Sequence, residues 1–254
     1  MGKISDTLLM NDVIDDIIKG HLILHIPHSK TKIPIMDGYN TDLIDSQIEL
    51  LTDHSTDEIF KIPDVESLVF PYSRIFCDVE RLSDEEEPMF KYGRGFYYTN
   101  TDDGKVLRDV VEDIKSKIKT EYYDSHHNTF EKMVSDRLEK YGTSCIIDCH
   151  SFTNEPFETD IDKTDNRPDI CLGTDDYHTP PWLIKMVKTH FETNGLSVKI
   201  NSPYSGTIIP MKYFLKDKRV SGIMIEINRS LYMEGGNILK NKVEWLNTIL
   251  VNLF

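Results

Sequence analysis

The stretch SCIIDCHSF, residues 144–152, has the pattern of a buried strand whose last positions are polar. It begins with the apolar run 145–147 and then places Asp148 and His150 where that run would continue. Side chains alternate across a strand, so Asp148 and His150 share one face. In open α/β sheets ligands bind at the carboxyl ends of the strands, and a histidine beside a carboxylate is a typical metal ligand or catalytic base. A hydrogen-bonded core histidine would give the same pattern.

Strand-like and helical patterns alternate along the rest of the chain. Strand-like runs lie at LILHI (22–26) and near residues 67–77, 144–149, 169–173, 197–200 and 220–227, and helical patterns cover residues 5–19, 41–61, 105–141 and 181–194. This order predicts an α/β fold with a mixed, mostly parallel sheet and helices on both of its faces. No linker interrupts the 254 residues, so we expect a single domain over residues 1–254.

Composition excludes several classes of protein. The formal net charge of −14 argues against binding to nucleic acid, which relies on clustered Lys and Arg. No apolar run approaches the roughly 20 residues of a membrane helix. The four cysteines lack CxxC spacing, which is typical of reduced thiols and not of a thiolate zinc site. We therefore expect a cytoplasmic protein that acts on a small molecule, without a nucleic-acid or membrane partner.

Polar residues also follow or end three other predicted strands. They are His28 after LILHI, Asp78, Glu80 and Arg81 at the end of SRIFCDVER, and Glu226, Asn228 and Arg229 in GIMIEINR. Glu226 lies among isoleucines, so its carboxylate either points into a site or is buried with a cation such as Arg229.

The segment LTDHSTDEIF adds acidic residues that could complete a metal site. Asp53 and Asp57 are i, i+4 neighbours on a predicted helix, which favours a cation nearby. Two histidines and one carboxylate form a common catalytic zinc set, with water in the fourth position. His28, His150 and one of these aspartates would supply that set, and His54 is a rival ligand.

Six motifs in order resemble the N-formylglutamate amidohydrolase family over almost the whole chain. They are IPHS (26–29), DHSTDEIF (53–60), SRIFCDVER (73–81), IIDCHSF (146–152), PYSGT (203–207) and IEINRSLYM (225–233). The resemblance implies a phosphorylase/hydrolase-like α/β fold, similar to the zinc carboxypeptidases and aspartoacylases, with a single Zn²⁺. It also implies hydrolysis of the amide bond of an N-acyl amino acid, with N-formyl-L-glutamate giving formate and L-glutamate.

The family pattern also assigns roles to individual residues. By resemblance, His28 and His150 are metal ligands and Glu226 is the catalytic residue that moves the proton of the attacking water. We expect Asp148 to orient a ligand and not to bind the metal itself.

The resemblance identifies the third metal ligand less directly. We expect Asp57 to be this ligand. The carboxypeptidases carry the carboxylate three residues after their first histidine, where this chain has Thr31, so Asp53 and His54 stay open as alternatives.

Arginines are the expected contacts for a substrate carboxylate. The resemblance implies that Arg81 binds the α-carboxylate through a bidentate fork. The remaining candidates for substrate contact are Arg74, Tyr204, Ser205, Asn228 and Arg229. Two alternatives stay open: a metallopeptidase or deacylase that acts on another N-acyl amino acid or small peptide, and a catalytically silent binding protein of the same fold.

Overall fold

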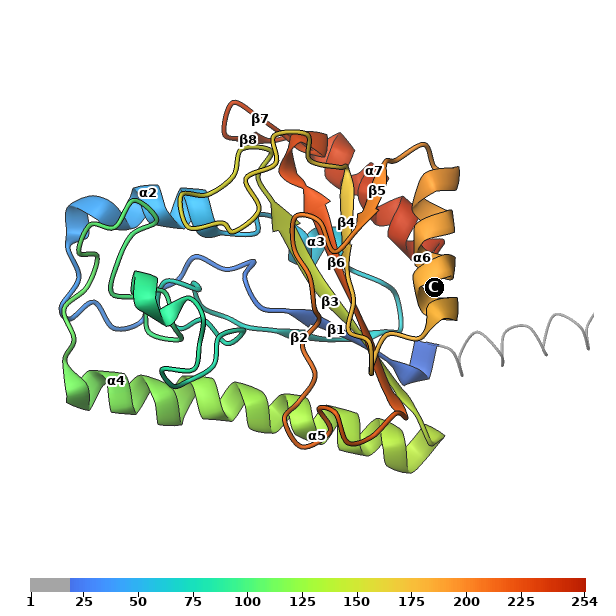
Figure 1. Cartoon of the computed structure of the whole chain (residues 1–254), viewed down its shortest axis with the longest axis horizontal. Helices are drawn as coiled ribbons and strands as arrows, with labels where there is room; N and C mark the ends of the chain where they lie inside the picture. Colours follow the sequence, from blue (N-terminus) through green and yellow to red (C-terminus); the bar gives the residue numbers. More distant parts are fainter. Residues whose placement is uncertain (1–18) are drawn as a thin grey trace, which may run out of the picture.

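A mixed sheet forms the centre of the computed structural model, which describes residues 19–254 (Figure 1). Within these residues the main sheet has six strands in the order β2-β1-β3-β6-β4-β5. The strands are β1 (Leu22–Ile26), β2 (Glu66–Val69), β3 (Ser144–Phe152), β4 (Ile170–Gly173), β5 (Val198–Ile200) and β6 (Val220–Asn228). Strand β4 runs antiparallel to β6 and every other neighbouring pair is parallel. The predicted α/β class with a mostly parallel sheet is confirmed.

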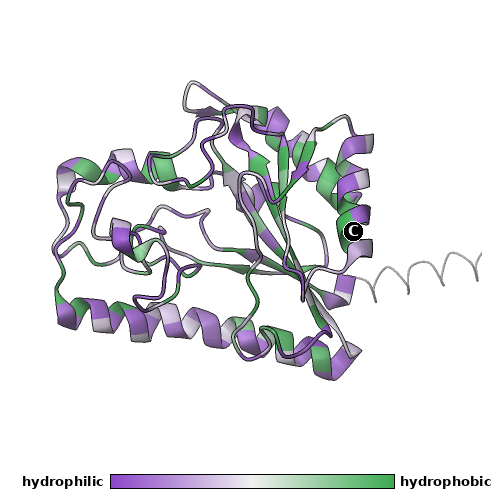
Figure 2. Cartoon of the chain, viewed as in Figure 1, coloured by the Kyte–Doolittle hydropathy of each residue, from purple (hydrophilic) through white to green (hydrophobic). Residues whose placement is uncertain are grey.

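Helices cover both faces of this sheet. Helix α5 (Asp124–Tyr141) packs Phe130 and Val134 against Ile23 and Ile146 on one face. Helices α3 (Thr56–Ile59), α6 (Pro181–Thr193) and α7 (Lys240–Val251) cover the other face, where the apolar side chains of alternate strand positions meet them. Figure 2 shows the apolar strands between helices whose outer surfaces are polar. Each strand therefore sends successive side chains into two different cores.

Two further helical segments and a small hairpin complete the described elements. Helix α2 (Thr41–Leu51) is capped by the Asn40 side chain, and α4 (Glu112–Ile118) continues through a π-helical turn (Lys119–Tyr123) into α5. Short 3₁₀ turns lie at Phe90–Tyr92 and Arg229–Leu231, and β7 (Met233–Glu234) pairs with β8 (Asn237–Ile238). The long irregular segments around 70–89 and 153–169 lie beyond the carboxyl ends of the parallel strands.

Several predicted boundaries were wrong. The strand expected near 67–77 ends at Val69, and SRIFCDVER forms turns because the chain leaves the sheet before Pro71. The helix expected over 41–61 is broken at residues 52–55, where Ser55 has a φ of 59°. The helical pattern predicted over 105–141 begins at Glu112. The helix predicted over 5–19 lies outside the described residues except for its last position.

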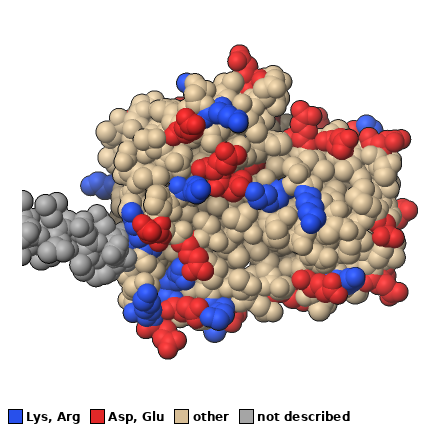
Figure 3. Space-filling model, turned by 180° about the vertical axis from the view of Figure 1, so that it is seen from behind, with Lys and Arg blue, Asp and Glu red and all other residues tan. Residues whose placement is uncertain are grey.

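Charged side chains are mixed on the surface. On the face shown in Figure 3, lysines and arginines are scattered among acidic residues and form no continuous stripe there. Among residues 19–254, no helix has the length and apolar character needed to cross a membrane.

Candidate active site

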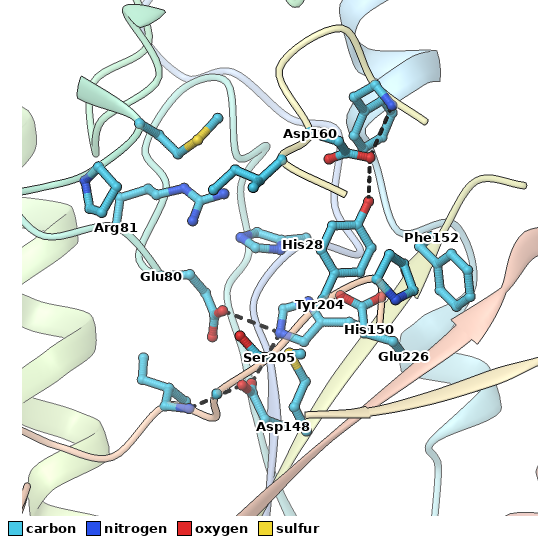
Figure 4. Close-up of a pocket in the computed structure, with 18 of the residues that line it drawn as sticks. His28, Glu80, Arg81, Asp148, His150, Phe152, Asp160, Tyr204, Ser205 and Glu226 are labelled. Carbon is cyan, nitrogen blue, oxygen red and sulfur yellow. Dashed lines mark hydrogen bonds and ion pairs between the residues drawn. The ribbon is translucent and has the colours of Figure 1, made fainter. Parts of the chain in front are cut away.

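Three parallel strands bring polar side chains to one end of the sheet. His28 follows the end of β1, His150 lies near the end of β3, and Glu226 lies near the end of β6. His150 and Glu226 are register partners on adjacent strands, so their side chains leave the same face at the same height. Figure 4 shows these residues around one pocket.

Asp53 joins the two histidines because the helix breaks. Its backbone N–H donates to the carbonyl of His28 at 3.0 Å, which holds residues 52–55 beside the end of β1. Asp53 Oδ2 then lies 3.1 Å from Nδ1 of His150 and 3.6 Å from Nδ1 of His28. Each of the three residues is at least 95% buried. Three donor atoms of the types that bind divalent transition metals therefore converge.

The second nitrogen of each imidazole is held by another carboxylate. His28 Nε2 donates to Asp78 Oδ1 at 2.8 Å, and His150 Nε2 lies 3.1 Å from Asp148 Oδ1. Nδ1 of His28 is buried and has no hydrogen-bond partner among the residues that the structure describes. Carboxylates that hold the outer nitrogens of metal-binding histidines are typical of metal sites, and they leave both Nδ1 atoms facing Asp53.

A buried arginine fixes the orientation of Asp53. Arg229 Nη2 donates to Asp53 Oδ1 at 2.9 Å, and its other nitrogens donate to the Leu50 carbonyl and to the Ser151 hydroxyl. Burial opposes ionisation of Asp53, but the hydrogen bond from His150 and the nearby His28 and Arg229 lower its pKa below the ordinary range. Asp53 is thus an oriented carboxylate whose second oxygen faces the histidines.

Glu226 is the carboxyl group beside this cluster. Its Oε2 is buried and has no hydrogen-bond partner within residues 19–254. Burial raises the pKa of Glu226 to about 8, although His150 acts in the opposite direction. A carboxyl group with a raised pKa in a cavity is a candidate for proton transfer.

A cavity of about 710 Å³ opens in front of these groups. Its wall combines residues of the strand ends with the irregular segments, including Arg74, Arg81, Arg94, Phe157, Asp160, Tyr204, Ser205 and Met224. Within this wall the side chain of Arg81 is 28% exposed, and it lies 3.7 Å from Asp78. The Nε atom of Arg81 is buried without a hydrogen-bond partner in the described part of the chain.

The other arginines of the wall are already paired. Arg74 donates to Asp78 Oδ2 through Nε and Nη2, at 3.2 and 2.9 Å, and Arg94 donates to Asp102 at 2.8 Å. Arg81 is therefore the cavity arginine best able to receive an anion.

Tyr204 is fixed at the cavity rim by a hydrogen-bond network. Its hydroxyl donates to Asp160 Oδ2 at 2.9 Å and accepts from Arg167 Nη1 at 3.2 Å, while Arg167 Nη2 donates to the same aspartate at 2.8 Å. The turn of Tyr204 and Ser205 thus meets the segment around Asp160 across the cavity.

Some residues singled out from the sequence lie elsewhere. Asp57 forms an ion pair with Lys30 and is outside the histidine cluster, and His54 donates to the carbonyl of Glu49. The α-helical i, i+4 relation assumed for Asp53 and Asp57 is absent because the helix breaks between them. Asn228 caps a 3₁₀ turn through Ser230.

Arg229 and Asn228 do not line the cavity. Arg229 contacts the site through its hydrogen bond to Asp53. The sequence indicated Asp78 and Glu80 as polar residues at a strand end but gave them no role; the structure places Asp78 against His28 and Glu80 beside His150. His25 in the first strand was missed. The sequence signal for His25 was its place inside LILHI, where an imidazole interrupts an apolar strand.

The fold and site together define a class: α/β proteins with a histidine- and carboxylate-lined cavity at the carboxyl ends of a mostly parallel sheet. The family model described as N-formylglutamate amidohydrolase matches residues 20–233. The chain therefore belongs to the N-formylglutamate amidohydrolase family, as its sequence motifs predicted.

Solved structures show the same fold. An N-formylglutamate amidohydrolase from Ralstonia eutropha superposes with a TM-score of 0.78 at 20% identity, covering 92% of each chain. A gene product of Agrobacterium tumefaciens gives a TM-score of 0.63 at 16% identity, covering 94% of this chain and 91% of that one. No curated protein matched the sequence. Identities this low support the shared architecture and not a shared substrate.

Proposed function

We propose that this protein is a zinc-dependent hydrolase that cleaves the amide bond of an N-acyl amino acid, with N-formyl-L-glutamate as the best-supported substrate. The observation that carries the proposal is the convergence of His28, Asp53 and His150 beside the unpartnered oxygen of Glu226, at the base of one cavity. Family membership supports the reaction class. The release of formate and L-glutamate is the reaction named by the family.

The three donor residues fit a Zn²⁺ ion. Nδ1 of His28 is buried and has no hydrogen-bond partner among residues 19–254, and two imidazoles with one carboxylate form a typical catalytic zinc set. We assign Asp53 as the third ligand in place of Asp57, because Asp53 faces both Nδ1 atoms and Asp57 is paired with Lys30. When bound there, zinc polarises an amide carbonyl and lowers the pKa of water.

Glu226 is proposed to move the proton during hydrolysis. Its carboxylate accepts a proton from the attacking water as the new C–O bond forms, and it then protonates the amine nitrogen as the C–N bond breaks. One water and one amide become a carboxylic acid and an amine, so the atoms balance. Burial and the charge of Asp53 raise the pKa of Glu226, and a neighbouring divalent cation favours the carboxylate that this role needs.

Arg81 is proposed to bind the α-carboxylate of the substrate. Its guanidinium lies in the cavity wall, with Nε 3.7 Å from Asp78 and without a hydrogen bond to any residue in 19–254, whereas Arg74 and Arg94 are hydrogen-bonded to aspartates. Tyr204 and Ser205 form the opposite rim. We assign Arg74, Asn228 and Arg229 to positioning: Arg74 holds Asp78, Asn228 caps the turn after β6, and Arg229 holds Asp53.

The decisive experiment measures metal content and formate release on one purified sample. Zinc-loaded protein should release formate from N-formyl-L-glutamate, and chelation should abolish this turnover in a way that added Zn²⁺ restores. A matched panel of N-acetyl-L-glutamate, N-formyl-L-aspartate and N-formyl-L-leucine defines the acyl group and side chain preferred. Turnover of a panel member but not of N-formyl-L-glutamate would overturn the substrate assignment, and substrate binding without any turnover would indicate a silent binding protein.

A further inference from the structure

A second cluster of potential ligands lies next to the one that holds His150. His25 in β1 and Asp148 in β3 are register partners on adjacent parallel strands, and both side chains leave the face covered by α5. Glu80 reaches the same point from the irregular segment after β2. One nitrogen of His25 and one oxygen from each carboxylate all lie within 4.8 Å of one another.

The distances in this cluster are slightly shorter than those between ligands of one metal ion. His25 Nδ1 lies 3.0 Å from Asp148 Oδ1 and 3.1 Å from Glu80 Oε1. Nitrogen and oxygen atoms bound tetrahedrally at their usual zinc distances lie about 3.3–3.6 Å apart. A modest expansion of the cluster would therefore admit an ion.

Hydrogen bonding alone leaves this cluster incompletely satisfied. Glu80 Oε1 is buried without a hydrogen bond from any residue in 19–254, although His25 Nδ1 is close, because the ring is aligned with Asp148 instead. Glu80 Oε2 lies 3.3 Å from His150 Nε2. Glu80 and Asp148 thus lie side by side between His25 Nδ1 and His150 Nε2, and two adjacent buried carboxylates favour a cation between them.

The ring of His25 is held so that Nδ1 faces the carboxylates. Its Nε2 lies 2.9 Å from Nε2 of His126 on α5, and its plane stacks on Phe130 at a centroid distance of 4.7 Å. Asp148 is fixed in turn, because its Oδ2 accepts from the backbone N–H of Ile208 at 3.2 Å. Partners of this kind behind the ligands are a regular feature of metal sites.

We propose that His25, Glu80 and Asp148 form a second site for a divalent transition-metal ion. One imidazole and two carboxylates suit Zn²⁺ or Mn²⁺. The ring of His150 separates the two sites: Nδ1 faces the first through Asp53, and Nε2 faces Glu80 and Asp148. An ion in the second site neutralises both carboxylates and fixes the orientation of His150. This site is inferred from its own residues and does not depend on the reaction proposed above.

The test is a metal stoichiometry on the full-length protein. The protein is stripped with a chelator, freed of it, and equilibrated by dialysis with Zn²⁺ alone and, separately, with Mn²⁺ alone; bound metal per chain is measured by mass spectrometry. Wild type should bind two equivalents of Zn²⁺. Glu80→Gln and His25→Gln should each bind one. Glu87→Gln is the matched control, since Glu87 lines the same cavity outside the cluster, and it should bind two.

His28→Ala separates the two sites. It removes a ligand of the first site only, so it should lose one equivalent and keep the other, while the double variant His28→Ala/Glu80→Gln should bind none. A wild-type stoichiometry of one equivalent that is lost in His28→Ala overturns the second site and leaves an ion-pair cluster of His25 with its carboxylates. Retention of two equivalents by folded Glu80→Gln and His25→Gln also overturns it, because the second ion then binds elsewhere. Circular dichroism of each variant establishes that it is folded.

Discussion

Nδ1 of His150 lies 3.1 Å from Oδ2 of Asp53, although 97 positions separate the two residues in the chain. The contact joins a strand end to a break between two helices. It closes the group of donor atoms that we assign to Zn²⁺.

Replacement of Asp53 should abolish retention of the zinc ion that we assign to His28, Asp53 and His150, whereas replacement of Asp57 should not. Asp53→Ala removes one of three protein ligands, and three ligands leave no redundancy. Asp57→Ala removes only an ion pair with Lys30 and is the matched control. Zinc per chain, measured after gel filtration, decides between them. Loss of metal in the Asp57 variant alone would restore the assignment made from sequence.

His28→Ala and His150→Ala should lose the same zinc ion as Asp53→Ala, because each removes one of the converging nitrogens. Normal zinc content in both variants would show that the metal is held by other residues.

Glu226→Gln should retain zinc and lose catalysis. The glutamine keeps the shape of the side chain but cannot accept a proton, so kcat should fall by about 10²-fold or more. Formate release and metal content on the same sample provide the measurement. Near-normal turnover would mean that Glu226 is only a buried partner of the surrounding cations.

Arg81→Ala should weaken recognition of a free carboxylate. A charge-assisted contact is worth on the order of 1.5–3 kcal/mol, so kcat/KM for N-formyl-L-glutamate should fall by roughly ten- to a hundredfold. The control is the same substrate with its α-carboxylate amidated, on which wild type and variant should differ little. Equal losses on both compounds, with zinc unchanged, would assign Arg81 a structural role.

Arg229→Met should destabilise the fold and weaken metal binding together. The variant leaves the Asp53 carboxylate buried without its cation, which typically lowers the free energy of unfolding by about 3–5 kcal/mol. It also removes the group that orients Asp53 as a ligand, which typically lowers metal affinity by about 10–100-fold. Urea unfolding of the metal-free protein and zinc titration measure the two effects. A stable variant with unchanged zinc affinity would contradict the positioning role.

The metal-free protein should lose stability as the pH rises from about 5 to 8 because of Glu226. Its pKa is about 8 in the folded protein, where burial raises it, against an ordinary value of 4.5. Between these values unfolding releases a proton, so a higher pH favours the unfolded state by roughly 1.4 kcal/mol per unit. The contribution is fully present below pH 4.5 and is lost as the pH passes 8.

Glu226→Gln cannot ionise and should lack this part of the pH dependence. Urea unfolding of both proteins in chelator at several pH values gives the comparison. Parallel stability profiles would show that Glu226 does not carry the raised pKa.

The sequence by itself determined the α/β class, the strand that carries His150, the family, and three groups now found around one cavity: His28, His150 and Glu226. These follow from local patterns, because alternation along a strand decides which side chains share a face, and the carboxyl ends of parallel strands meet at one edge. Strand LILHI was also located correctly from its apolar run.

The tertiary structure alone decided which carboxylate joins the histidines. An i, i+4 pattern treats Asp53 and Asp57 as equivalent, but the hydrogen bond from Asp53 to the His28 carbonyl and the positive φ of Ser55 break the helix between them. It also decided that Arg229 lies behind Asp53 and that His25, Glu80 and Asp148 meet. Such contacts join residues far apart in the chain, and their geometry depends on how strands and irregular segments pack, which no local sequence pattern encodes.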